Sequence, residues 1–272
     1  MTGGRADQPA RAAFFDVDKT LLPGSTLYLL ARGMYRRGMY TTRDLLGFGL
    51  SQLAFRVSGI EPVKGMEAAR ESALAFIEGK RKDQLEPIAQ DIVVEVIGPR
   101  IYPEMRKVIE AHHNNGDRTF LVTAAPEDIA IRIAKYLGLD GALGTRAECT
   151  DGVYTGKLLG PVLHGPAKLE AVRKLAAEED IDLALSSAYS DSMNDRPLLE
   201  GVGHAVAVNP DRMLKRLAHD KGWPIQDFRS GRWLLVWGPS VAGALAAGEA
   251  VRRAVRRRAR RRHAPSRFID YD

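Results

Sequence analysis

The chain has 272 residues, 45% of them hydrophobic and 27% charged, which is the composition of a globular protein and excludes a disordered one. This length can bury a sizeable core and carry one modest inserted domain. The single cysteine, Cys149, excludes an intrachain disulfide; it favours a reducing compartment and is most simply a small hydrophobe. Eight arginines between residues 252 and 262 dominate the charge, since removing them changes the formal net charge from +6 to −2.

Residues 1–13 are polar and lack the long apolar stretch of a secretory signal. We therefore expect a cytoplasmic protein.

The first strong motif follows an apolar run through Phe14 and Phe15, which ends on Asp16 and Asp18 and then Thr20. Side chains alternate along a strand, so both carboxylates emerge on one side where the strand ends. They repel unless a cation or shared proton relieves them, and Mg²⁺ prefers hard oxygen ligands while keeping waters that a phosphate can displace. The alternative is an Asp-x-Asp turn, because aspartate also favours turns and helix N-caps.

The segment from Leu22 to Pro99 has apolar residues at helical spacing, which predicts helices at 27–31, 45–55 and 73–77. No repeat of 20 to 50 residues is evident, so a solenoid is not expected.

A second strand is predicted at 119–122, followed by Thr123 and a helical pattern from Asp128 to Leu137. A hydroxyl at a strand end, beside the unpaired amides of a helix start, makes a site for a phosphate oxygen. Thr123 could equally be an ordinary helix cap. Further along, residues 147–158, which contain Asp151 and Gly152, predict a hairpin.

A helix is predicted to begin near Gly165 and to run to Glu179, with Lys168 in its first turn. A cation is mildly disfavoured at a helix N-terminus, so we expect an anion beside Lys168. The alternative is a solvated surface lysine.

Residues 183–190 predict a further strand, which runs into a second acidic cluster containing Asp191, Asn194 and Asp195. Ligand sites in open α/β sheets form in the crevice at the carboxyl ends of strands, so the four segments can converge there.

Taken in order, Asp16-x-Asp18-x-Thr20, Thr123, Lys168 and Ser190-Asp191-x-x-Asn194-Asp195 resemble the motifs of the haloacid dehalogenase-like hydrolase superfamily, subfamily IB, in its phosphoserine phosphatase-like branch. The resemblance covers about residues 10–228. It implies an α/β, Rossmann-like, mostly parallel sheet flanked by helices, with a small α-helical cap of the C1 type inserted after the first motif. The expected domains are a core at 10–24 and 100–228, a cap at 25–99 and a tail at 229–272.

The same resemblance implies the chemistry. Asp16 would attack phosphorus and form an aspartyl-phosphate, and Asp18 would be the general acid and base. Mg²⁺ would be held by Asp16, the backbone carbonyl of Asp18 and Asp191. The resemblance also implies that Thr123, Lys168 and Asn194 bind the phosphate oxygens. Thr20 would help to shape the phosphate-binding loop, and Asp195 would orient a metal-bound water or Lys168.

The substrate is less constrained, because the chain departs from the serine-directed members of the family. Those members carry a glutamate where this chain has Ser25, and usually glycines where Ala124 and Ala125 stand. The expected substrate is either a small metabolite phosphate, with phosphoserine and histidinol phosphate still possible, or a lysophospholipid-type phosphate, which the C-terminal tail could bring close to the enzyme.

The C-terminal tail has an uncharged run at 233–248 followed by the arginine cluster. Sixteen residues with a proline are short for a transmembrane helix, so 233–262 is interpreted as an interfacial segment in peripheral contact with anionic membrane at its cytoplasmic face. The alternative is a helix packed on the core with a solvated basic end. No specific nucleic-acid binding is expected, because no binding fold accompanies the charge. A second function class stays open: a regulatory or interaction protein recruited by this tail.

Overall fold

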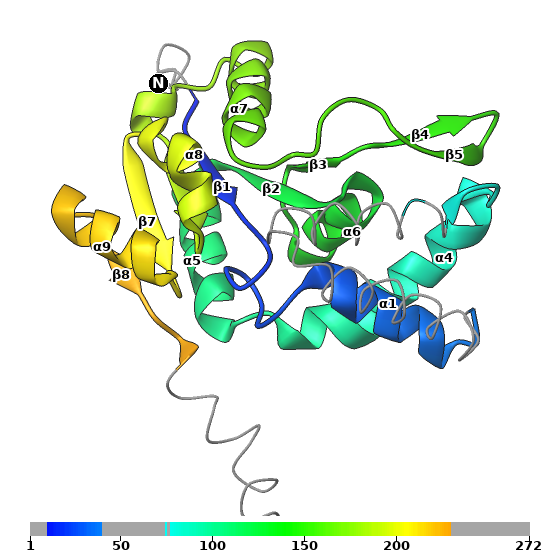
Figure 1. Ribbon diagram of the computed structural model, residues 1–272. Helices are drawn as coiled ribbons and strands as arrows, with labels where there is room; N and C mark the ends of the chain where they lie inside the picture. The colour runs from blue at the N-terminus through cyan, green and yellow to red at the C-terminus, as the bar shows by residue number, and fades with distance from the viewer. Residues whose placement is uncertain (1–9, 40–73, 75–76, 230–272) are drawn as a thin grey trace, which may run out of the picture. The chain divides into compact units, whose positions relative to one another are not determined.

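The computed structural model describes residues 10–39, 74 and 77–229, to which all structural statements refer (Figure 1). Its centre is a six-stranded sheet with the order β3-β2-β1-β6-β7-β8, in which every adjacent pair is parallel. The strands are β1 (Ala12–Phe15), β2 (Arg118–Pro126), β3 (Gly141–Thr145), β6 (Ser187–Ser190), β7 (His204–Val208) and β8 (Ile225–Gln226). The mostly parallel α/β sheet predicted from the sequence is confirmed.

Strand β1 is short and lies in the middle of the sheet. Its four residues are all buried, as expected for a strand covered by helices on both faces. Phe15 pairs with Leu121 on one side and with Tyr189 on the other. Strands β2 and β3 lie on one side of β1, whereas β6, β7 and β8 lie on its other side. The direction in which successive strands are added therefore reverses between β1 and β6. Such a switch point is where α/β sheets form ligand sites, at the carboxyl ends of the strands.

Helices cover both faces of the sheet. Side chains from α7 (Pro166–Glu178), α8 (Arg196–Glu200) and α9 (Arg212–Lys221) share one apolar cluster with Phe14, Phe120 and Val122. Helices α5 (Pro103–Asn114) and α6 (Glu127–Leu137) connect β1 to β2 and β2 to β3, and the right-handed crossover rule for parallel strands assigns them to the opposite face.

Two predicted strands differ in their bounds. Residues 183–185 form a 3₁₀ turn, η3 (Leu183–Leu185), because the Asp182 side chain accepts a hydrogen bond from the Ala184 N–H at 2.8 Å and offers the backbone a local alternative to the sheet. Strand β2 continues past Val122 to Pro126, with an irregular register against β3, and α6 begins directly after it.

The predicted hairpin is confirmed as β4 (Ala147–Thr150) paired antiparallel with β5 (Val153–Leu158). Cys149 lies in β4 and is exposed, so it does not serve as a small apolar side chain of the core.

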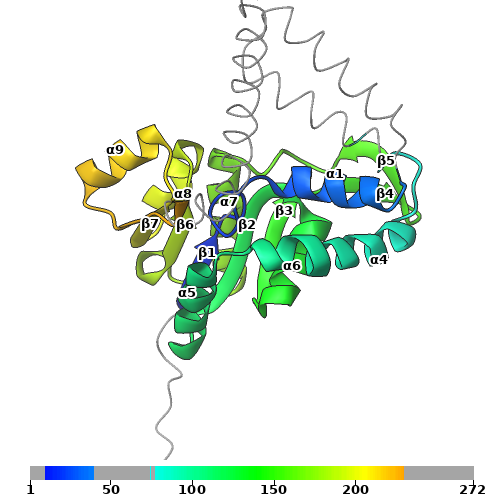
Figure 2. The ribbon, with the colours of Figure 1, turned by 90° about the horizontal axis from the view of Figure 1, so that it is seen from below.

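Two helices of the predicted cap region are described, α1 (Thr26–Arg36) and α4 (Lys82–Ile92), followed by the π turn η1 (Val93–Ile97) and the 3₁₀ turn η2 (Gly98–Arg100). Helices α1 and α4 lie side by side (Figures 1 and 2). A Cβ atom at Gly33 would come within 2.8 Å of the Ile92 side chain, so only glycine permits this approach.

The predicted helix at 45–55 lies outside the described residues, as does that at 73–77 apart from Leu74 and Ile77. The domain boundaries stay a prediction. Residues 228–272 form a separate unit, of which the structure describes two residues, so the predicted membrane segment is also outside it. Within the described parts of the chain, no helix has the length and apolarity needed to span a bilayer.

Candidate active site

The loop after β1 carries the first motif. Asp16 is 6% exposed, and its backbone N–H donates to the Tyr189 carbonyl of β6 at 3.0 Å, which continues the sheet by one bond. The loop turns at Lys19, whose φ of 61° lies in the left-handed region. The buried Thr20 hydroxyl donates to Asp16 Oδ2 at 3.2 Å, and Asn209 Nδ2 donates to the Lys19 carbonyl at 2.8 Å.

Asp18 is bound to the start of α1. The Thr26 N–H donates to Asp18 Oδ1 at 2.7 Å, and the Thr26 hydroxyl donates to the same oxygen. The side chain of Ser25, the residue that precedes the helix, makes no capping bond. Asp18 therefore serves as the N-terminal cap of α1 from eight residues upstream.

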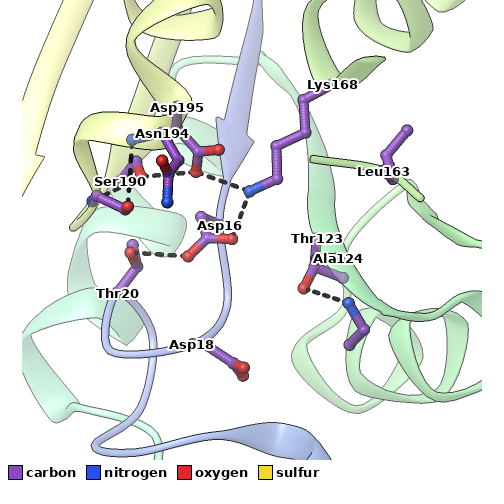
Figure 3. A network of polar contacts seen from close by, with 12 residues as sticks. Asp16, Asp18, Thr20, Thr123, Ala124, Leu163, Lys168, Ser190, Asn194 and Asp195 are labelled. Atoms are coloured by element: carbon purple, nitrogen blue, oxygen red, sulfur yellow. Dashed lines mark hydrogen bonds and ion pairs between the residues drawn. The ribbon is translucent and has the colours of Figure 1, made fainter. Parts of the chain in front are cut away.

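Lys168 lies between two aspartates in the interior (Figure 3). Its Nζ is 2.7 Å from Asp16 Oδ1 and 2.7 Å from Asp195 Oδ2, and Lys168 and Asp195 are each 2% exposed. Burial alone would lower the pKa of Lys168, but the two negative charges outweigh it and raise the pKa. The alternative of a solvated lysine was wrong, because the helix start carries the ammonium inward to buried carboxylates.

Asp191 is a buried carboxylate with no direct partner among the described residues. It is 7% exposed, and its side chain has no hydrogen bond or ion pair to a residue that the structure describes. Burial raises the pKa of Asp191 to about 7; the negative charge of Asp16 adds to the shift, and Lys19 opposes it. Burial likewise raises the pKa of Asp16 to about 6, against the lowering effect of Lys168.

Asp16 and Asp191 are buried carboxylates that need positive charge nearby in order to be ionised together. Asp16, Asp191 and Asp195 carry three negative charges when ionised, and Lys168 supplies one positive charge among them. A hard divalent cation beside Asp16 and Asp191 would remove the cost of ionising both. No cluster of three or more His, Cys, Asp or Glu side chains suited to a metal ion occurs in the described ranges. The set implied by the resemblance needs only two carboxylates plus a backbone carbonyl, and the buried carboxylates of Asp16 and Asp191 offer the hard oxygen atoms that Mg²⁺ prefers.

Thr123 lies within β2, three residues before its end at Pro126, and not at the strand end that the sequence predicts, whereas Asn194 lies in the 3₁₀ turn η4 (Met193–Asp195) after β6. Thr123 is 1% exposed, and its Oγ1 accepts a hydrogen bond from the Ala125 N–H at 3.2 Å. Because α6 begins only at Glu127, Thr123 is not the cap of that helix, and this alternative was wrong. Asn194 is exposed, and its side chain makes no hydrogen bond to another described residue.

Four residues of this region were missed by the sequence-based assignment of roles. Each makes a hydrogen bond to a residue of the site or of its loops: Ser190 to Asp195, Thr26 to Asp18, Asn209 to the Lys19 carbonyl and Thr145 to the Ala124 carbonyl. Only Ser190 carried a local signal, since it directly precedes Asp191 in the quoted motif. The other three are brought to the site by the fold.

Asp16 follows the central strand of a parallel sheet, at its switch point, and contacts a buried lysine, which is the arrangement of an α/β protein with a ligand site at the carboxyl ends of its strands. The family model of the haloacid dehalogenase-like hydrolases matches residues 13–200, and the chain belongs to that family. Within the family it is a phosphatase of the phosphoserine phosphatase-like branch.

Two curated relatives and one solved structure are similar to this chain. The chain is 46% identical over 239 residues to the phosphoserine phosphatase SerB1 of Mycobacterium tuberculosis, covering 88% of this chain and 77% of the relative. It is 28% identical over 221 residues to a histidinol-phosphatase of Neisseria meningitidis, covering 80% of this chain and 98% of the relative. A crystal structure of a protein of unknown function from Bordetella pertussis superposes with a TM-score of 0.71 at 29% identity, covering 81% of this chain and 99% of that one.

Proposed function

We propose that this phosphatase is a Mg²⁺-dependent phosphomonoesterase that works through an aspartyl-phosphate on Asp16. The observation that carries the proposal is the position of Lys168, whose ammonium lies 2.7 Å from Asp16 inside the protein. A buried carboxylate held by one hydroxyl and one cation is oriented for attack, and the same cation can neutralise charge on the transferred phosphoryl group.

In the first half-reaction, an oxygen of Asp16 forms a bond to phosphorus while the bond from phosphorus to the ester oxygen breaks. Asp18 donates its proton to the departing oxygen. In the second half-reaction, Asp18 takes a proton from water, whose oxygen attacks phosphorus. The aspartyl–phosphorus bond then breaks, which releases inorganic phosphate and restores Asp16.

Mg²⁺ would be held by Asp16, the Asp18 carbonyl and Asp191, and when bound it supplies positive charge to the phosphoryl oxygens. Thr123 and Asn194 would donate to those oxygens. Thr20 bonds Asp16 and would fix its orientation, and Asp195 would hold Lys168.

For the substrate, we propose a phosphate ester of a small primary alcohol that carries an ammonium group on the neighbouring carbon. Phosphoserine and histidinol phosphate share this unit, and the two similar proteins are named for them. Ser25, beside α1, stands in place of the glutamate expected for the ammonium, so the chain would bind that group differently. A lysophospholipid-type phosphate is the competing substrate.

The test is a hydrolysis assay on the purified chain with Mg²⁺. The panel contains phosphoserine, histidinol phosphate, phosphoethanolamine, lysophosphatidate and a generic aryl phosphate. We expect the amino-alcohol esters to have the highest kcat/KM. Asp16→Asn should lower turnover at least about 10³-fold and leave the circular dichroism spectrum unchanged. A folded wild-type chain inactive on the whole panel would refute the proposal, and preference for lysophosphatidate would replace the substrate class.

We also propose a cytoplasmic location. The exposed thiol of Cys149 supports it, because free cysteines persist in a reducing compartment. A protease-protection assay that placed the catalytic part outside the inner membrane would overturn it.

A further inference from the structure

Ser190 is the last residue of β6 and is completely buried. Its hydroxyl donates to Asp195 Oδ2 at 2.7 Å, and its Oγ accepts from the Ser192 N–H at 3.2 Å (Figure 3). The hydroxyl thus donates one hydrogen bond and accepts one, both within the segment that carries the second acidic cluster. Ser190 has no hydrogen bond to Lys168 or Asp16 in the described part of the chain, so any effect on these two residues passes through Asp195.

Asp195 Oδ2 is the oxygen that also receives Lys168 Nζ, at 2.7 Å. One buried carboxylate oxygen therefore has two donors, a neutral hydroxyl and an ammonium. The same ammonium donates to Asp16 Oδ1. Ser190, Asp195, Lys168 and Asp16 form an unbroken chain of hydrogen bonds from the end of β6 to the end of β1.

The hydroxyl matters because Lys168 has two buried anions to choose between. A carboxylate in a low-dielectric interior attracts a cation strongly when nothing else neutralises it. The Ser190 hydroxyl takes part of the charge of Asp195 and fixes the direction of its carboxylate. Without this donor, the ammonium would move toward Asp195 and away from Asp16.

We infer that Ser190 is a positioning residue, which acts through Asp195 to keep the Lys168 ammonium on Asp16. The inference rests on the proposed function, because it assigns Ser190 an effect on attack by Asp16. Since Lys168 bonds Asp16 and, in the proposed function, neutralises charge on the phosphoryl group as it is transferred, the loss should appear mainly in kcat and only slightly in KM.

The test is Ser190→Ala, which removes only the oxygen from a fully buried side chain. We expect kcat to fall about tenfold, the size of effect that follows from losing a hydrogen bond to a charged group, with KM within about twofold. Ser190→Thr restores the hydroxyl and should recover most of kcat.

Ser186→Ala is the matched control. Ser186 is also completely buried near β6 and makes two hydrogen bonds, from the Ala12 N–H and to the Asp182 carbonyl, but at the opposite end of the strand. Its loss should lower the melting temperature without changing kcat. Equal kcat losses in the two alanine variants would mean that Ser190 has only a structural role.

A double-mutant cycle with Asp195→Asn decides whether Ser190 acts through Asp195. We expect Ser190→Ala to add less than about a twofold loss of kcat in the Asp195→Asn background. Additive losses, or a wild-type kcat in Ser190→Ala, would overturn the inference while an active wild type left the proposed function standing. An inactive wild type would instead refute the proposed function, and the inference with it.

Discussion

Asp18 and Thr26 are joined by two hydrogen bonds that end on one carboxylate oxygen, Asp18 Oδ1. Thr26 is completely buried and is the first residue of α1, so the proposed acid/base group is tied to the first helix of the predicted cap. With Oδ1 occupied by two donors, Oδ2 is the oxygen that we expect to carry the transferred proton.

Thr26→Val should lower kcat about fivefold. Valine matches the shape of threonine but lacks the hydroxyl, so Asp18 keeps only the bond from the backbone N–H and loses part of its orientation. Thr26→Ser, which keeps the hydroxyl, should stay within about twofold of wild type. Steady-state kinetics on the best substrate measure this, and a fully active valine variant would contradict it.

The metal-free protein should lose stability as the pH rises from about 5 to 8. The pKa values of Asp16 and Asp191 are raised to about 6 and about 7 in the folded protein, above the ordinary 3.8. A group with a raised folded-state pKa stabilises the fold below its unfolded pKa and loses that contribution as the pH passes the folded value. We expect the melting temperature to fall by on the order of 5 °C over this range in a chelator.

Mg²⁺ should reverse this loss and raise the melting temperature more at pH 8 than at pH 5, because it binds the ionised carboxylates. Asp191→Asn is the control: it should be more stable than wild type at pH 8 without metal, and it should gain little from Mg²⁺. A pH profile that is the same for wild type and Asp191→Asn would rule out this origin.

Lys168→Met should be both inactive and unstable. Removing the ammonium leaves Asp16 and Asp195 buried without their shared partner, which costs about 3–5 kcal/mol in the free energy of unfolding. We expect kcat/KM to fall at least about 10²-fold. Urea titration and kinetics measure the two effects, and a stable Met variant would show that water reaches these carboxylates.

Tyr154→Phe should weaken the attachment of the hairpin to α6. The Tyr154 hydroxyl donates to Asp128 Oδ2 at 2.8 Å, and Lys82 Nζ at the start of α4 lies 2.7 Å from the other oxygen. Removing this hydroxyl should lower the free energy of unfolding by about 1–2 kcal/mol, measured by urea titration, and leave kcat unchanged. A loss below about 0.3 kcal/mol would show that Lys82 alone holds Asp128.

The protein should sediment with anionic vesicles if residues 233–262 are an interfacial segment. We expect the full chain to bind vesicles that contain phosphatidylserine at low salt, and deletion of 229–272 to abolish binding with hydrolysis of soluble esters intact. Absence of binding would remove both the membrane contact and the reason for a lysophospholipid substrate. If the deletion removed the biological role but Asp16→Asn did not, the chain would be an interaction protein.

The sequence alone determined the order of the chemical groups. Short apolar runs that end on Asp16 and Asp191 mark the ends of β1 and β6, because side-chain alternation and burial are local properties of a strand. The run that ends on Thr123 marks a strand but not its end, since β2 continues to Pro126. The resemblance to a known family rested on these residues in this order, and the family is confirmed. The hairpin and the start of α7 could also be predicted from the sequence, since a turn and a helix start each depend on a few neighbouring residues.

Only the tertiary structure decided which groups touch. Lys168 and Asp16 are 152 positions apart, and their contact depends on β1 lying beside β6 and on α7 beginning at that edge. The sequence could not decide whether Lys168 is buried or solvated, because burial is a property of the packed chain. The hydroxyl of Ser190 and the cap formed by Asp18 gain their meaning in the same way, from partners that only the fold brings within hydrogen-bond distance.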